Sequence, residues 1–590
     1  MTDQTVRRRD PNRRWFYAAF VFAAIAVFAN LGSEGIYAAQ EGRTAIILRN
    51  MFRTGNYLEM DVRGGVPYEK PIGHYWLCLP SAYFAKLGGD AIQSKVEWGI
   101  RIPSALCSLF TVLLAGLLAK RLYGTRTGAM TMVILATMSN FDKLGRLGHI
   151  DMPLAAAFTA AMYFLYTGYF EERKTNWRIY LFYVALGWGM LLKGPLVLLL
   201  AALVVLGLSA TRGKRWHEVP RDLRLVHGAL IVLAIALPWY IYECIHSHGE
   251  FFREFIVRQN LLRFTGDAAV YHKSRPVWYY IPKLLAGALP WSLIGVAGLC
   301  VYSKRIVKFD FSDRSRFVLI WFLTGFVFFS LAGVKRIDYL LPIFPALAIM
   351  IARAVSRWCA ETPAAPRALW LTIWVAVAGL LLLLFVVNTS GMLVALGQKI
   401  QTGKVPFFTE HDGMSIVMFS EFLIDHAMEV LEALAIALLL TFAIGSNMEK
   451  SLYNRAFGFA AVFVLGMFLA YHLAIEPGTD DRKTVRTFAA EARGMIGRHD
   501  GIVYFGDFNT ELVYFMDHDE CRNEGLDKNA DISAADLSAR FTEKDRWVIA
   551  PPFAAEKLRQ AAPGAWRERL RTIENHQYPQ VLLERVSTAK

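Results

Sequence analysis

Long apolar segments recur along the whole chain and limit the folds that it can adopt. About thirteen such segments are present, centred near residues 24, 110, 133, 160, 186, 203, 233, 292, 325, 346, 378, 437 and 465. A helix of about 20 apolar residues crosses the hydrocarbon core of a bilayer. With 590 residues, of which 55% are apolar and 19% charged, the chain is too apolar for a soluble multidomain protein and too long for one span. The sequence therefore predicts a polytopic α-helical membrane protein with about 13 transmembrane helices.

Lys and Arg residues gather in alternate short loops, and this sets the expected orientation. The basic loops are segments 7–14, 120–126, 171–178, 212–224, 303–316 and 353–367. Because short basic loops remain cytoplasmic, we expect the N-terminus in the cytoplasm and the C-terminal region outside the inner (plasma) membrane. The formal net charge of +14 is explained by this topology. The sequence has no groove-reading motif or soluble basic domain, so it does not indicate a nucleic-acid partner.

The composition changes near residue 476, which divides the chain into two predicted domains. Residues 1–475 carry the apolar segments and a polar first external loop at 34–97, whereas residues 476–590 are more polar. The second part begins with a helical pattern, DDRKTVRTFAAEARGMIG, followed by the strand-like runs GIVYFGDF, RWVIAPP and PQVLLERV. We expect a small C-terminal extracytoplasmic α/β domain. Its Asp480–Asp481 pair suits the start of a helix better than a metal site, because the helix dipole favours negative charge there.

Ionisable residues directly behind the first apolar segment mark the first external loop as a candidate catalytic loop. From Glu41 onward the pattern EGRTAIILRNMF predicts an amphipathic helix along the membrane interface. On this helix Arg49 and Arg53 are expected to be solvated anchors. Glu69 and Lys70 are adjacent and flanked by prolines. A rigid acid–base pair of this kind, close to a bilayer, indicates chemistry rather than a turn alone.

Three further charged clusters fall on the same predicted membrane face. They are segment 142–151 with Arg146 and Asp151, segment 258–275 with His272, and segment 335–339 with Lys335, Arg336 and Tyr339; Lys193 adds a cation at a Gly-Pro break that ends one span or interrupts a longer one. Asp151 precedes Met-Pro and also fits the N-cap of a helix, so both interpretations stay open. Phosphate oxygens accept charge-assisted hydrogen bonds from Arg and Lys, so these cations suit an anionic lipid headgroup or a leaving phosphate.

The ordered set of motifs resembles a known family. Its pattern, roughly DE-x-RYAEIAREM, SGDW, YFEKPP and YW, is similar to QEGRTAIILRNM, TGNY and PYEKPIGHYW in this chain. Similar motifs follow at 99–106 (GIRIPSAL), 146–152, 191–195 (LLKGP), 276–280 (PVWYY), 288–291 (ALPW) and 328–348. Over about residues 15–355 the chain resembles bacterial membrane glycosyltransferases of the GT-C fold, which are related to protein O-mannosyltransferases, and within them the lipid A aminoarabinose transferases.

The resemblance implies an inverting transferase of the GT-C fold. It would move a sugar from a polyprenyl-phosphate donor to a lipid, glycan or protein acceptor on the external (periplasmic) face, among membrane lipids. By motif position, the contacts to the donor phosphate or headgroup would be Arg43, Lys70, Arg146, Lys193, Lys335, Arg336 and Tyr339. Asp151 would be an active-site carboxylate. A divalent metal ion, where the reaction uses one, would be held by Glu69 or His272.

One position departs from the family pattern. Gln40 stands where the family has an acidic residue, and an amide cannot accept a proton at physiological pH. The proton acceptor is then Glu41, Glu34 or Asp151, while a phosphate acceptor would already be ionised. Two other functions stay open, namely a lipid or glycan transporter (flippase) and a catalytically altered family member. The repeats with paired broken helices that mark many transporters are not found in the sequence.

Overall fold

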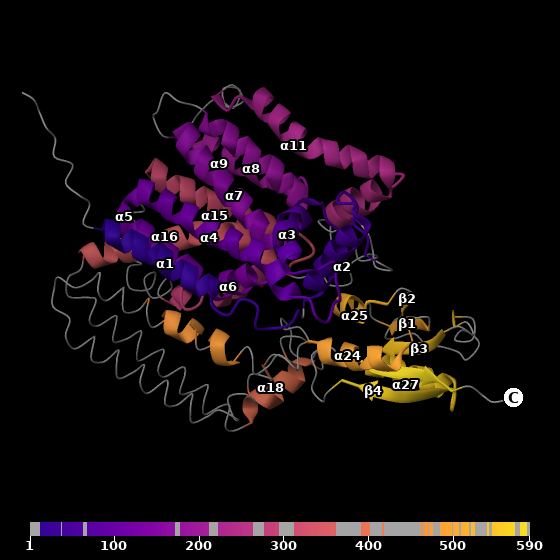
Figure 1. Cartoon of the computed structure of the whole chain (residues 1–590). Coiled ribbons are helices and arrows are strands. Elements are labelled where there is room, and N and C mark those ends of the chain that lie inside the picture. The colour runs from indigo at the N-terminus through magenta and orange to yellow at the C-terminus, as the bar shows by residue number, and fades with distance from the viewer. Residues whose placement is uncertain are drawn as a thin grey trace, which may run out of the picture.

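A computed structural model gives the arrangement of the chain (Figure 1). It describes residues 12–36, 38–62, 68–170, 177–211, 222–262, 276–293, 312–361 and 391–401, some positions between 413 and 475, and most positions from 484 to 586.

Most of the described chain is helical. The longer helices are α1 (Arg13–Phe28), α2 (Ala39–Thr54), α4 (Val96–Tyr123), α7 (Asp151–Leu165), α8 (Arg178–Lys193), α9 (Leu196–Thr211), α11 (Leu225–His246), α15 (Asp313–Leu331) and α16 (Phe344–Glu361). The shorter helical pieces are α3 (Gly73–Phe84), α5 (Thr125–Ala136), α6 (Ser139–Arg146), η1 (Tyr166–Phe170), η2 (Phe252–Leu262), η3 (Val277–Tyr279), α13 (Tyr280–Gly287), η4 (Ile337–Ile343), α18 (Met392–Gln401) and η5 (Tyr471–Ile475). Helix α4 packs against α5 and α7, and α7 packs against α8, so their apolar side chains form one continuous core.

Four described helices are long and apolar enough to cross a membrane. They are Val96–Tyr123, Leu225–His246, Asp313–Leu331 and Ile337–Arg357. Helices also occupy the apolar segments near residues 24, 133, 160, 186 and 203. The total number of spans stays a prediction, because the segments centred near 378 and 437 lie outside the described residues.

Helix α11 shows the side-chain distribution of a lipid-facing helix. One of its faces is apolar and exposed, and consists of Leu230, Leu233, Leu237 and Ile241. The opposite face is buried and includes Val232, Ala236 and Trp239. An exposed apolar face is costly in water and favourable in hydrocarbon, so this distribution fits a helix in a bilayer.

The Gly-Pro break after Lys193 separates two helices. Helix α8 ends at Lys193 and α9 begins at Leu196. Gly194 has φ 81°, a left-handed conformation that glycine adopts without strain. An added Cβ there would also lie 2.7 Å from the Phe255 ring. Of the two interpretations left open by the sequence, the structure has two separate helices, and Lys193 lies at the C-terminal end of the first.

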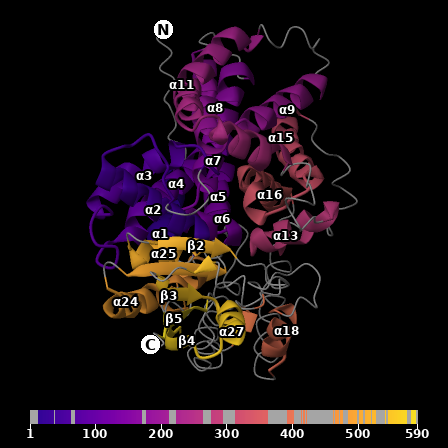
Figure 2. The same cartoon turned by 90° about the vertical axis from the view of Figure 1, so that its right-hand side faces the viewer.

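A five-stranded sheet lies near the C-terminus, below the helices in Figure 2. The strands are β1 (Gly501–Gly506), β2 (Cys521–Gly525), β3 (Asp545–Ala550), β4 (Trp566–Arg571) and β5 (Val581–Arg585), in the order β2-β1-β3-β5-β4. Strand β1 pairs in parallel with β2 and β3, and β5 pairs antiparallel with β3 and β4. The helices of this part are α24 (Arg486–Met495), α25 (Thr510–Met516) and α27 (Pro552–Ala561). Parallel strands covered on both faces need continuous apolar runs, which explains the sequence GIVYFG of β1.

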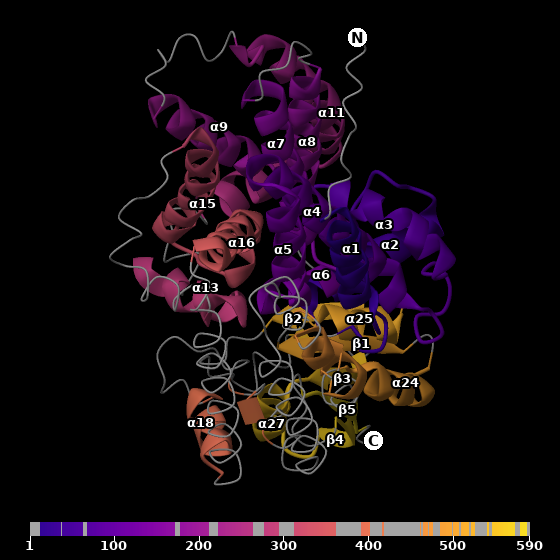
Figure 3. The same cartoon turned by 90° about the vertical axis from the view of Figure 1, so that its left-hand side faces the viewer.

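The sheet domain docks on α2 through α25 (Figures 2 and 3). Gly42 permits a very close approach, since an added Cβ would lie 2.6 Å from the backbone nitrogen of Glu511. Arg49 is fully buried and pairs with Asp517 at 2.9 Å, and Arg53 pairs with the same carboxylate at 2.7 Å. The expectation of a solvated anchor was therefore wrong for Arg49. A partner far away in the sequence takes the place of water.

We expect Gly42→Ala to loosen this docking, because the added methyl group would overlap the main chain of α25. Overpacking of this kind costs about 1–3 kcal/mol. The melting temperature should fall in detergent, and limited proteolysis should release the C-terminal domain sooner. Gly494→Ala is the matched control, since its Cβ would meet nothing within 4 Å and Ala favours the helix over Gly. Equal protease resistance of Gly42→Ala and the natural protein would contradict the contact.

Candidate active site

Asp151 and Lys193 form a buried ion pair between the first residue of α7 and the last residue of α8. The Lys193 ammonium donates to Asp151 Oδ1, and the two side chains are 12% and 3% exposed, respectively. The same ammonium lies 4.6 Å from the centre of the Tyr339 ring, within the range of a cation–π contact. Three residues that the sequence predicted from three separate segments are thus brought together.

Arg336 and Asp338 extend this group from the chain between α15 and α16. Arg336 Nη2 lies 2.8 Å from Asp338 Oδ2. The Tyr280 hydroxyl fixes the same segment, because it accepts from the Arg336 backbone N–H at 3.1 Å and donates to the Arg336 carbonyl at 2.9 Å. The PVWYY motif therefore serves to hold the Lys-Arg motif in place.

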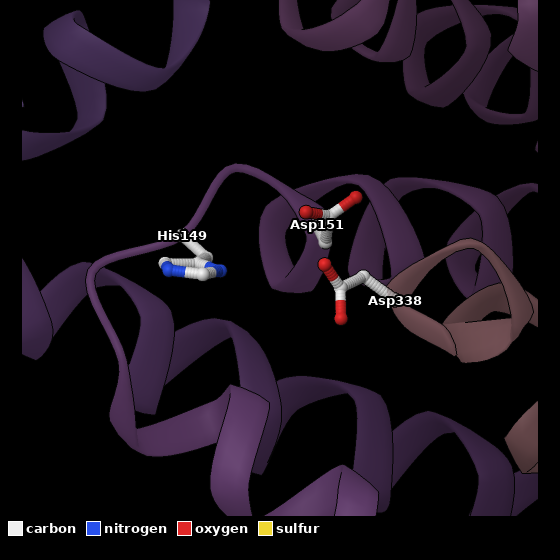
Figure 4. A group of neighbouring side chains, drawn as sticks. All are labelled: His149, Asp151 and Asp338. Carbon is white, nitrogen blue, oxygen red and sulfur yellow. The ribbon is translucent and has the colours of Figure 1, made fainter. Parts of the chain in front are cut away.

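His149, Asp151 and Asp338 face one another (Figure 4). One ring nitrogen of His149 and one carboxylate oxygen of each aspartate lie within 4.8 Å of one another, a spacing that ligands of a metal ion would have. However, Lys193 and Arg336 already neutralise the two carboxylates. A divalent cation would fit only after one of these pairs opened, so the ion pairs are the arrangement that the residues favour. The six residues Asp151, Lys193, Tyr339, His149, Arg336 and Asp338 are called the Asp151 cluster below.

The EKP motif directly precedes α3, which packs on the end of α8 that carries Lys193. Arg43 of α2 pairs with Glu69 at 3.1 Å, and Lys70 follows at a half-buried position. Gly73 packs directly on α8, where an added Cβ would lie 2.7 Å from the carbonyl oxygen of Leu191. Gly73, three residues after Lys70, therefore contacts α8 at a residue that lies two positions before Lys193. Arg43 holds the carboxylate that the sequence offered as a metal ligand.

Glu41 is fully buried and bound by two groups. Arg101 donates to both of its carboxylate oxygens, and the Gly148 backbone N–H donates to Oε1 at 2.8 Å. Beside it, Gln40 is half-buried, and its side-chain oxygen has no hydrogen-bond partner among the described residues. Glu34 is buried as well.

Three other predicted residues have different surroundings. Arg146 is buried and donates to the carbonyls of Ala26 and Val27 at the C-terminal end of α1, which is typical of a helix-capping cation. Burial lowers the pKa of Lys335, and its ammonium donates to the Ala332 carbonyl. His272 lies outside the described residues, as do Asp480 and Asp481.

Three contributors were not singled out by the sequence, namely Arg101, His149 and Asp338. Arg101 lies in the GIRIPSAL motif inside an otherwise apolar span. A charge in such a segment is itself a sign of function or of a buried partner. That signal was present, but the partner of the charge lies 60 residues away in the sequence.

Comparison with known proteins gives a consistent result. A family described as dolichyl-phosphate-mannose-protein mannosyltransferase matches residues 74–242. An undecaprenyl phosphate-alpha-4-amino-4-deoxy-L-arabinose arabinosyl transferase of Pseudomonas fluorescens is 29% identical over 352 residues, 58% of this chain and 59% of the relative. A relative with the same description from Pseudomonas aeruginosa is 30% identical over 337 residues, 55% of this chain and 56% of the relative. The matched region spans about three fifths of the length of these relatives.

Solved structures resemble the chain over nearly its whole length. The crystal structure of ArnT from Cupriavidus metallidurans bound to undecaprenyl phosphate has a TM-score of 0.72 at 20% identity, covering 98% of this chain and 99% of that one. The archaeal oligosaccharyltransferase AglB from Archaeoglobus fulgidus has a TM-score of 0.50 at 10% identity, covering 92% and 70%. The chain therefore has the fold of these membrane proteins, and the resemblance seen in its motifs is confirmed.

Lys193→Met should destabilise the protein, because it leaves the buried Asp151 carboxylate without its main counter-charge. Removal of one partner from a buried pair costs about 3–5 kcal/mol. Thermal unfolding in nanodiscs would measure the loss. The double variant Lys193→Met/Asp151→Asn removes both charges and should regain most of the stability. A double variant that melts as early as the single variant would contradict the pairing.

The stability should also fall in mild acid. Burial lowers the pKa of His74 to about 4, with a further contribution from the His149 charge, and burial lowers the pKa of His149 as well. A histidine whose pKa is depressed on folding costs stability as the pH falls below its unfolded value of about 6.5. The melting temperature should therefore drop between pH 7 and pH 4. His74→Gln/His149→Gln should flatten this dependence, and an unchanged slope would argue against two neutral buried imidazoles.

Proposed function

We propose that this protein is an inverting glycosyltransferase that moves a sugar from a polyprenyl-phosphate donor to an acceptor at the external face of the inner membrane. Its N-terminus would lie in the cytoplasm and its C-terminal domain outside. The leading observation in support is the buried ion pair of Asp151 and Lys193, with the Tyr339 ring beside it. This pair lies in a fold that the chain shares with a protein crystallised with undecaprenyl phosphate.

The Asp151 cluster has the charges that a phosphate needs. Lys193 approaches from the end of α8 and Arg336 from the segment just before η4, and each is held by an aspartate. An incoming phosphodiester would compete with these aspartates for the same N–H groups, so the cations are ready before the donor arrives. Charge-assisted contacts to phosphate oxygens are stronger than neutral hydrogen bonds. Arg43 and Lys70 would add further contacts from the first external loop.

The transfer itself is a single displacement. An oxygen of the acceptor forms a bond to the anomeric carbon, and the bond from that carbon to the phosphate oxygen breaks on the opposite face, which inverts the configuration. The electron pair leaves with the polyprenyl phosphate, which gains one negative charge. Lys193 and Arg336 would stabilise this developing charge, which lowers the barrier more than it strengthens donor binding.

The identity of the proton acceptor depends on the acceptor substrate. A hydroxyl group must lose a proton, and Gln40 cannot take it. Asp151 is the best placed carboxylate, with Glu34 as the second candidate. An ionised phosphate acceptor needs no base. The curated relatives are described by an aminoarabinose donor, so aminoarabinose transfer to lipid A is one candidate reaction, beside transfer to a glycan or protein.

A direct assay would use the purified protein in nanodiscs with a panel of labelled undecaprenyl-phosphate sugars and candidate acceptors. We expect transfer of label to one class of acceptor and release of undecaprenyl phosphate. Movement of the donor between leaflets without any transfer would instead identify a transporter. Comparison of lipid A, surface glycans and glycoproteins by mass spectrometry, with and without the protein, would identify the acceptor.

Arg336→Gln should weaken binding of the polyprenyl-phosphate donor, because it removes a positively charged hydrogen-bonding group from the proposed phosphate site. A hydrogen bond to a charged group is worth about 1.5–3 kcal/mol, or roughly a 10–100-fold change in Kd. Binding of undecaprenyl phosphate would be measured in nanodiscs. Arg13→Gln removes the same charge at an exposed position on α1 and is the control. Equal affinity of the two variants would return Arg336 to a purely structural role.

A further inference from the structure

Arg101 and Glu41 form a buried ion pair that joins α4 to α2. The Nε and Nη2 atoms of Arg101 donate to the two carboxylate oxygens of Glu41 at 2.8 and 3.0 Å. The side chains are 3% and 0% exposed, respectively. Because water does not solvate either charge, each depends on the other.

The remaining N–H groups of Arg101 reach the chain that leads from α1 to α2. Nη1 donates to the carbonyls of Leu31 and Glu34, and Nη2 donates to the carbonyl of Gly35 at 2.9 Å. All five N–H groups of the planar guanidinium thus have acceptors. A lysine could supply the charge but not this geometry, so the site is built for an arginine.

Glu41 also binds the segment that carries the Asp151 cluster. Its Oε1 atom accepts the Gly148 N–H, and the Ser104 hydroxyl of α4 donates to the His149 carbonyl at 3.2 Å. Asp151 follows two residues later. Segment 148–151 is therefore held by α2 and α4 directly before the carboxylate that pairs with Lys193.

The state of the Glu41 carboxylate favours a holding role. Burial raises the pKa of Glu41, but the charge and hydrogen bonds of Arg101, together with the Gly148 N–H, outweigh burial and leave the pKa below its ordinary value. The carboxylate stays ionised, and both oxygens are occupied. Such a group is a poor proton acceptor at neutral pH.

We infer that Arg101 and Glu41 are positioning residues, whose ion pair sets the place of segment 148–151, and with it Asp151, relative to the first external loop. The catalytic consequence rests on the proposed function, whereas the structural consequence does not. Glu41 then holds the site in place, and a group other than Glu41 accepts the proton of a hydroxyl acceptor.

A double-mutant cycle separates a positioning pair from a catalytic base. Glu41→Gln and Arg101→Gln each leave one buried charge without its counter-charge, and the double variant leaves neither. We expect each single variant to lower kcat by roughly 10–100-fold, the effect of a misplaced reacting group, with little change in the KM for the donor. The double variant should recover to within about tenfold of the natural protein, because coupled residues are not additive.

Hydrogen–deuterium exchange without substrate tests the position of the segment directly. In Glu41→Gln the amides of 148–151 should exchange at least about fivefold faster, since the segment opens locally. Glu243→Gln is the matched control. Glu243 is another buried glutamate, on α11, and the charged residues that act on it are His246 and Glu59. This control should leave exchange at 148–151 unchanged.

Two results would overturn the inference. One is unchanged exchange at 148–151 in Glu41→Gln. The other is a double variant that is as inactive as Glu41→Gln, while the pH–rate profiles of both variants lose their acidic limb. That result would identify Glu41 as a catalytic base. A protein that transfers no sugar from any donor would refute the proposed function instead, and the exchange measurement would still decide the positioning role.

Discussion

Charges removed from water must find counter-charges within the protein, and this requirement organises the region where the helices meet the C-terminal domain. Asp151 pairs with Lys193, Glu41 with Arg101, and Arg49 with Asp517. Each pair joins segments that are 42 or more residues apart in the sequence. A buried charge without a partner costs several kcal/mol, so the helices can adopt only those arrangements that bring the partners together. The polar residues therefore determine the packing here as strongly as the apolar ones.

Helix α2 shows how such pairs couple two parts of the molecule. On one side it contacts α25, where Gly42 meets the Glu511 backbone and the Thr510 hydroxyl donates to the Ala39 carbonyl. On the other side Glu41 binds Arg101. Consecutive residues of one helix thus face the sheet domain and the interior of the bundle. Displacement of the C-terminal domain would move α2, and the effect would reach the residues that α2 holds.

The sequence predicts which residues belong to the candidate site better than it predicts how these residues contact one another. Asp151, Lys193 and Tyr339 could be selected because charged or polar groups in apolar surroundings are costly and so have a reason to be there. The contacts among these three residues could not be predicted, because they depend on the way α7, α8 and η4 pack. Arg146 was selected by the same signal, yet it caps α1. Burial marks a charge as important without revealing whether it binds substrate or another part of the chain.

Gln40 limits the acid–base chemistry available to the polar loop that follows α1. Its amide takes no proton, and Glu41 beside it is held ionised by Arg101. A hydroxyl acceptor then depends on a carboxylate from elsewhere, which must give up its own cation in order to act. Under the proposed function, Asp151 would meet that condition once the donor phosphate drew Lys193 away from it. Donor binding would thus create the free carboxylate that a hydroxyl acceptor needs, whereas an ionised phosphate acceptor would be repelled by it. The two classes of acceptor place opposite demands on one residue.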